Sequence, residues 1–305
     1  MTVSSENIRR GVALIILTAF AISAQDAVFK QFSSNATLWQ IFALRGLIVI
    51  GFFLIFGLLR GRFRPLFQTA FTRWSLLRAA CLTTTFLAFY AALPFLSLST
   101  VGAANYMAPI FVALLSAFVA REAVSRFVLI GACLGFIGVV VLLRPGSDVF
   151  SPLVLLPVMG AAFYAVGHLV TRARCQNIGA ASLALSLNAT MMGAGLLISA
   201  LILFVPLPED MVARNPYIFG PWSPLGPQDW LFLAILAGFA IAIGMMLAAA
   251  YKTAPPAIVA TFEYSYLVFA AGWDILFFGA ALTPWSIAGM ALIVGAGLLV
   301  LRHRP

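Results

Sequence analysis

Charged residues are scarce in this chain: 9% of its 305 residues are Asp, Glu, Lys or Arg, whereas 63% are hydrophobic. Soluble domains carry roughly 25% charged residues, so a soluble fold is excluded. Cysteine is also rare, and the three residues Cys81, Cys133 and Cys175 supply no disulfide scaffold. The composition predicts an all-α integral membrane protein in a lipid bilayer.

Groups for enzymatic chemistry are nearly absent as well. The two histidines, His168 and His303, cannot supply a metal cluster, and the sequence contains no glycine-rich phosphate loop or paired-carboxylate motif. We therefore predict no enzyme, no cofactor and no metal site. A membrane-embedded enzyme acting on a lipid, or a channel or receptor, stays open as a lesser alternative.

Long hydrophobic runs dominate what is present. A membrane-spanning helix needs about 20 mostly apolar residues. The one long connection between predicted spans, from Pro206 to Asp229, is rich in Pro and Gly and is predicted to be a surface loop. An N-terminal signal peptide after Arg9 and Arg10 is an alternative for the first run. Ten windows qualify as spans: 11–31, 36–58, 75–96, 100–119, 126–143, 151–171, 180–204, 230–250, 256–278 and 283–301.

An internal repeat relates residues 98–144 to residues 256–302. A constant shift of 158 positions places Gly131 on Gly289 and Tyr106 on Tyr264. The repeats are expected at 1–146 and 147–305. Because each contains five spans, an odd number, the second copy enters the bilayer inverted. The sequence thus predicts ten transmembrane helices as two five-helix inverted repeats, the architecture of alternating-access carriers.

The excess of basic residues indicates the orientation of the chain in the membrane and does not require a nucleic-acid partner. With the N-terminus in the cytoplasm, basic residues concentrate in the inner segments, as the positive-inside rule expects. Both termini are therefore predicted to be cytoplasmic. The outer side keeps only Lys30, Arg144 and Arg214. The inner residues are Arg9, Arg10, Arg60, Arg62, Arg64, Arg73, Arg78, Arg121, Arg126, Arg172, Arg174, Lys252, Arg302 and Arg304.

Several motifs resemble one family. The run Arg121-Glu122-Ala123-Val124-Ser125-Arg126, followed by Gly131 to Gly138 and Leu143-Arg144-Pro145, looks like the signature between the fourth and fifth helices of EamA-type carriers in the drug/metabolite transporter superfamily. Arg45-Gly46 is similar to that family's second-helix arginine. The second half matches at Tyr251-Lys252-Thr253-Ala254-Pro255 and Ala260-Thr261-Phe262-Glu263-Tyr264, but Ala280 and Ala281 replace an acid.

The resemblance implies a carrier that moves small metabolites, often amino acids, outward across a bacterial inner membrane. It also implies that the fifth and tenth helices are peripheral, and that most of the others surround a central cavity. Glycines at Gly131, Gly135 and Gly138 agree with close packing of the peripheral pair. A monomer and a homodimer both stay open.

Polar residues inside the spans are the candidate site, because ionisable groups at membrane depth are costly and face a cavity or partner by default. Asp26, Arg45 and Asn105 are expected in the outer half of their helices, and His168 and Glu263 in the inner half. The repeat relates Glu263 to Asn105, and a shift of 142 relates His168 to Asp26, as two gates would require. Purely structural roles are the alternative: Arg45 could form an ion pair with Asp26 that holds two helices together, and His168 could be a buried core residue. The candidates are Gln25, Asp26, Arg45, Asn105, His168 and Glu263.

Aromatic residues flank these positions and are expected to enclose an apolar side chain or a cationic amine. They are Phe86, Tyr90, Tyr106 and Tyr264, with Tyr266 nearby. Together with Glu263 and Arg45, they favour a secondary exporter of neutral and aromatic amino acids or related small metabolites. A carrier of nucleoside-like metabolites such as S-adenosylmethionine is the alternative.

Overall fold

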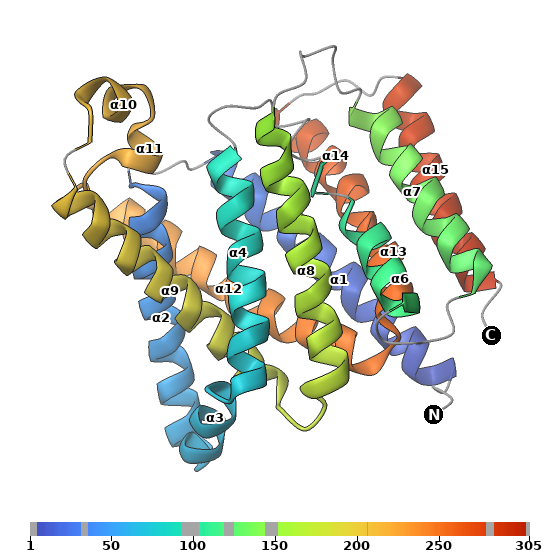
Figure 1. The fold of residues 1–305 in the computed structure, drawn as a ribbon, viewed down its shortest axis with the longest axis horizontal. Helices are drawn as coiled ribbons and strands as arrows, with labels where there is room; N and C mark the ends of the chain where they lie inside the picture. Colours follow the sequence, from blue (N-terminus) through green and yellow to red (C-terminus); the bar gives the residue numbers. More distant parts are fainter. Residues whose placement is uncertain are drawn as a thin grey trace.

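The computed structural model describes residues 5–31, 36–92, 104–105, 107–118, 125–143, 152–205, 207–278 and 284–302. These residues form helices, turns and bends and contain no strand, as the predicted all-α class requires. The long helices run side by side through the molecule (Figure 1). In chain order the helices are α1 (Ser5–Gln31), α2 (Leu38–Leu59), α3 (Phe63–Ala70), α4 (Arg73–Ala92), α6 (Ala108–Phe118), α7 (Arg126–Leu143), η1 (Pro152–Val154), α8 (Leu155–Arg174), α9 (Ala180–Phe204), α10 (Glu209–Arg214), α11 (Pro216–Phe219), α12 (Pro227–Thr253), α13 (Pro256–Glu263), α14 (Ser265–Phe278) and α15 (Pro284–Arg302).

Five of the described helices are long and apolar enough to cross a membrane. They lie at Glu6–Val28, Leu38–Leu59, Leu155–Arg174, Ala180–Phe204 and Pro227–Thr253, and shorter apolar helices lie at Arg126–Val141 and Ile287–Leu299. Large apolar side chains such as Leu59, Leu203 and Phe204 point outward from these helices, as contact with lipid requires. The chain is therefore a multi-pass membrane protein, whereas the count of ten spans stays a prediction.

The predicted window 256–278 is not one continuous helix. Helix α13 ends at Glu263, Tyr264 forms a turn, and α14 begins at Ser265. The amide of Leu267 bonds to the Tyr264 carbonyl at 3.1 Å, an i to i+3 spacing typical of a 3₁₀ turn. Met107 also lies in a turn, ahead of α6. The shift of 158 places Met107 on Ser265, the residue directly after the Tyr264 turn, so the two turns lie within one position of each other in the repeat.

Close helix packing depends on small residues. Helices α7 and α15 lie side by side at one edge of the molecule (Figure 1). A Cβ added at Gly138 of α7 would lie 2.9 Å from the carbonyl oxygen of Gly289 in α15, so the predicted glycine contact is present there. Gly160 and Gly167 of α8 likewise lie against α4. In lipid the hydrophobic effect does not drive helices together, so van der Waals packing at such close backbone contacts holds them instead.

The connection between α9 and α12, predicted as a surface loop, contains the short helices α10 and α11. It is bound to the start of α2 by buried polar side chains. The indole nitrogen of Trp39 donates to the Ile218 carbonyl at 2.6 Å. The amide of Gln40 donates to the Ser223 carbonyl at 2.8 Å and accepts from the Ser223 backbone at 3.0 Å. This connection is therefore a fixed cap over one end of α2.

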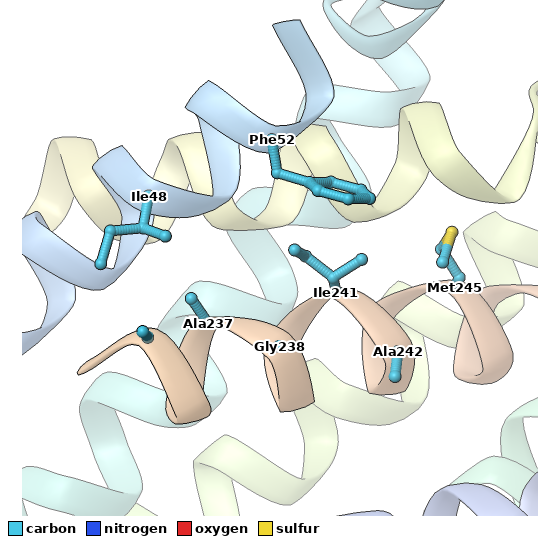
Figure 2. A pocket seen from close by; sticks show the side chains of 8 residues that line it. Ile48, Phe52, Ala237, Gly238, Ile241, Ala242 and Met245 are labelled. Carbon is cyan, nitrogen blue, oxygen red and sulfur yellow. The ribbon is translucent and has the colours of Figure 1, made fainter. Parts of the chain in front are cut away.

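A shallow groove of about 390 Å³ lies between α2 and α12. Figure 2 shows apolar side chains from both helices along it. Among the described residues, no charged or hydrogen-bonding side chain lines the groove, so we assign it to the lipid-facing surface and not to the substrate path. Its lining includes Ile48, Phe52, Ala237, Gly238, Ile241 and Met245.

Candidate functional site

The candidate site is built around Glu263, the last residue of α13, at the point where the helix is interrupted. Two tyrosine hydroxyls donate to the same carboxylate oxygen, Oε1. Tyr164 of α8 does so at 2.8 Å, and Tyr251 of α12 does so at 2.6 Å. Three separate helices therefore converge on one acidic group.

His168 extends this arrangement on α8. Its ring stacks on Tyr251 with the ring centroids 3.7 Å apart and the planes 22° from parallel. It also contacts Tyr164, four residues earlier on the same helix face, at 4.2 Å. His168 is fully buried, and neither ring nitrogen has a hydrogen-bond partner among the described residues. We call Glu263, Tyr164, Tyr251 and His168 the Glu263 cluster.

The Glu263 cluster can bind a cation or exchange a proton. A carboxylate that accepts two hydroxyl hydrogen bonds is held in a fixed position, and its charge favours an ammonium group. The stacked tyrosine and histidine rings add aromatic faces around it. Across the described residues, no three His, Cys, Asp or Glu side chains meet as a metal site would require.

A second polar contact joins α1 to α14. The hydroxyl of Tyr266 donates to the Asp26 carboxylate at 2.6 Å. Nearby, the indole of Trp273 donates to the Ser23 hydroxyl at 3.0 Å. Tyr266 follows Glu263 by three residues in the chain, just after the turn at Tyr264. The acidic groups of α1 and α13 are thus carried at neighbouring levels of the bundle.

The structure does not join Arg45 to Asp26. The Arg45 guanidinium contacts the Met191 sulfur of α9 at 3.6 Å and lies 5.5 Å from the Phe42 ring centroid. Asp26 bonds instead to Tyr266. Gln25 and Asn105 are half-buried. Of the predicted polar residues, His168 and Glu263 come together, whereas Asp26 and Arg45 belong to separate contacts.

The predicted aromatic residues occupy different surroundings. Tyr264 is fully buried, packs its ring directly on Gly135 of α7, and donates to the Ala132 carbonyl at 3.2 Å. These are the contacts of a packing residue. Phe86 packs in a hydrophobic cluster between α2, α4 and α9. The side chain of Tyr90 and the whole of Tyr106 lie outside the described residues.

Three residues of this region were not predicted as functional. Tyr164 shares a helix face with His168, and that four-residue spacing is the signal by which it can be found. Tyr251 belongs to the motif quoted above but carried no assigned role there. Arg78 was assigned to the inner loops because it lies near the end of its predicted window. Arg78 instead lies within α4 and is fully buried.

An ionisable cluster at a helix interruption inside an all-helical, multi-pass membrane protein is typical of a membrane transporter. Residues 9–144 match the EamA-like transporter family. An uncharacterized transporter of Helicobacter pylori is 27% identical over 70% of this chain and 68% of its own length. The pseudopaline exporter CntI of Pseudomonas aeruginosa is 24% identical over 97% of this chain and 98% of its own length. The EamA match and these relatives support an EamA-type carrier of the drug/metabolite transporter superfamily, a family whose members are transporters and not enzymes.

Two further similarities bear on cargo and fold. A riboflavin transporter of Rhizobium johnstonii is 30% identical over 55% of this chain and 50% of its own length. A solved crystal structure that is 20% identical superposes with a TM-score of 0.74, over 97% of this chain and 96% of that chain. At that level of identity the superposition shows a shared fold alone.

Proposed function

We propose that this carrier exports neutral and aromatic amino acids, or related small metabolites, by alternating access. In this proposal the Glu263 cluster is the inner gate, and its carboxylate binds the cargo ammonium or carries a proton. The observation that carries the proposal is the pair of tyrosine hydroxyls on one Glu263 oxygen, at 2.8 and 2.6 Å. A fixed intramembrane acid of this kind marks a substrate or ion pathway.

Helix pairing supports two inverted repeats at 1–146 and 147–305. In that scheme α1, α2, α4, α6 and α7 correspond to α8, α9, α12, α13 with α14, and α15. A twofold exchange then converts the contact of α4 with α8 into that of α12 with α1, and both contacts are present. Helices α2 and α9, and α7 and α15, each pack on their own counterpart. Two matched halves of this kind are the architecture from which many alternating-access carriers are built.

The distribution of exposed charge supports cytoplasmic termini in a bacterial inner membrane. Helix α3, the turn from α8 to α9 and the N-terminus lie toward one end of the molecule, and α10 and α11 lie at the opposite end (Figure 1). Exposed arginines flank α3 at the first end, whereas α10 begins with Glu209 and Asp210. This distribution follows the positive-inside rule.

Orientation can be tested by thiol labelling. Among the native cysteines, Cys133 is exposed, whereas Cys81 and Cys175 are buried. The experiment therefore uses a Cys133→Ala background. Burial also raises the pKa of the Cys175 thiol. In this background we expect Arg62→Cys to resist an impermeant maleimide in intact cells and to react after permeabilisation. Arg214→Cys is expected to react in both conditions. Labelling of both positions from outside would contradict the inverted-repeat topology.

The proposed cargo follows from the charges of the site. An amino acid carries an ammonium that suits Glu263 and a side chain that suits aromatic and apolar walls. A site that recognises the shared ammonium tolerates varied apolar side chains. The relative described as a riboflavin transporter favours a second candidate, a flavin-like or nucleoside-like metabolite.

The two candidates are separated by counterflow in proteoliposomes that contain the purified chain. We expect labelled phenylalanine to exchange without ATP, and unlabelled leucine, tyrosine and tryptophan to compete with it. Riboflavin and S-adenosylmethionine in matched excess serve as the alternative competitors. Saturable exchange of either compound that amino acids fail to inhibit would overturn the amino-acid assignment and leave the transporter assignment intact.

A further inference from the structure

Arg78 is a fully buried cation that the Glu263 cluster does not use. It lies in α4, about 7.5 Å along the helix from its first residue. Its Nε donates to the Thr171 hydroxyl of α8 at 2.8 Å, and its Nη1 donates to the Leu183 carbonyl of α9 at 3.1 Å. Its remaining nitrogen, Nη2, is buried and has no hydrogen-bond partner among the described residues.

No acidic side chain pairs with Arg78 within the described part of the chain. Both of its acceptors, a hydroxyl and a carbonyl, are neutral. A buried cation without a counter-charge is costly, because desolvation is repaid only by an opposite charge or a full set of hydrogen bonds. An anion that reached Nη2 would supply both. The site is therefore incomplete without an anionic partner.

Arg78 is connected to the Glu263 cluster along one face of α8. Tyr164, His168 and Thr171 follow each other at spacings of four and three residues, which places them on a single stripe. Arg78 bonds to Thr171 at one end of this stripe, and Tyr164 bonds to Glu263 at the other. The ends are about 10 Å apart along the helix axis. One face of α8 thus contacts a cation of α4 at one end and an acid of α13 at the other.

We propose that Arg78 is the anion-recognising residue of the carrier and binds the carboxylate of the cargo. The proposal rests on the proposed function, since it divides recognition of a zwitterion between two residues. The separation along α8 means that an amino acid contacts Arg78 and Glu263 in succession as it moves. The guanidinium fork suits a planar carboxylate, because it offers parallel N–H donors.

The test uses the full chain in lipid nanodiscs and measures ligand-dependent melting at constant ionic strength. The probes are L-phenylalanine, phenethylamine, which lacks the carboxylate, and hydrocinnamate, which lacks the ammonium. Arg78→Gln is expected to bind hydrocinnamate at least about tenfold more weakly than the unmodified chain and to bind phenethylamine unchanged. Glu263→Gln is expected to show the reverse. Arg73→Gln, at an exposed arginine of the same helix, is the matched control.

Each outcome decides the proposal. Wild-type affinity for hydrocinnamate in Arg78→Gln overturns it. If Arg78→Gln does not fold, Arg78→Lys decides instead. A lysine keeps the charge but lacks the guanidinium fork, so it is expected to weaken hydrocinnamate binding and leave phenethylamine binding unchanged. Hydrocinnamate binding by Arg78→Lys equal to that of the unmodified chain overturns the proposal. If the unmodified chain binds none of the three probes, the amino-acid assignment fails. Acetate and inorganic phosphate then test Arg78 alone: an anion-dependent melting shift that Arg78→Gln abolishes supports the anion site, and any other result rejects it.

Discussion

Glu263→Gln is expected to yield a folded, membrane-inserted protein whose amino-acid counterflow is about 10- to 100-fold slower than that of the unmodified chain. A hydrogen bond to a charged group contributes about 1.5–3 kcal/mol, and each 1.4 kcal/mol corresponds to about tenfold in affinity. Folding is expected to survive because the Gln carbonyl oxygen still accepts from Tyr164 and Tyr251, so neither hydroxyl loses its partner.

Counterflow and thermal melting should be measured on the same preparations. Glu209→Gln is the matched control, since it makes the same chemical change on the exposed helix α10. Its transport rate is expected to equal that of the unmodified chain. A Glu263→Gln protein that transports at the unmodified rate would remove Glu263 from the pathway. A protein that does not melt cooperatively would instead assign Glu263 a structural role.

Gly195→Ala is expected to destabilise the fold by about 1–3 kcal/mol, the range for overpacking a tight interface. A Cβ at Gly195 of α9 would lie 2.8 Å from the Trp39 carbonyl oxygen and 3.0 Å from the Ala43 amide nitrogen of α2. Both obstacles are backbone atoms, so no side-chain rotation relieves the clash. The helices have to separate, and the melting temperature of the detergent-solubilised protein is expected to fall.

Gly193→Ala is the control for this change, because it lies on the same helix and a Cβ there meets nothing within 4 Å. Its melting temperature is expected to equal or slightly exceed that of the unmodified chain, since Ala favours helix more than Gly. If the two variants melt alike, the close approach of α2 and α9 does not contribute to stability.

The predicted grouping of Glu263 with His168 agrees with the structure, whereas the suggested pairing of Arg45 with Asp26 does not, and the reason is physical. Glu263 and His168 are rare ionisable groups inside apolar helices, which marked both as candidates. They belong to one cluster because each contacts Tyr164 and Tyr251. Arg45 and Asp26 satisfied the same rule but found other partners, Met191 and Tyr266. Which partner a long side chain reaches depends on helix rotation, and an apolar sequence encodes rotation only weakly.

The packing role of Tyr264 could not be predicted from the sequence either. Its register with Tyr106 suggested a residue beside the cargo, but the missing side chain of Gly135 leaves a flat surface on α7 that the Tyr264 ring fills. Such complementarity depends on the approach of two helices that are far apart in the chain. Tyr164, by contrast, could be found from the sequence, because a hydroxyl-bearing ring one helical turn from His168 is a natural partner for an acid. Tyr251 lies on another helix, and only the fold brings it to Glu263.

The hydrogen bonds of Trp39 and Gln40 restrict how the carrier can open. They fasten the connection between α9 and α12 to the first turn of α2, with bonds at 2.6 to 3.0 Å to its backbone. These bonds, together with the packing of α2 on α9, favour movement of α2, α9 and this connection as one unit. Movement on this side of the membrane is then left to the seam between α1 and α14. If the carrier alternates as proposed, we expect the bonds from Tyr266 to Asp26 and from Trp273 to Ser23 to break when it opens there.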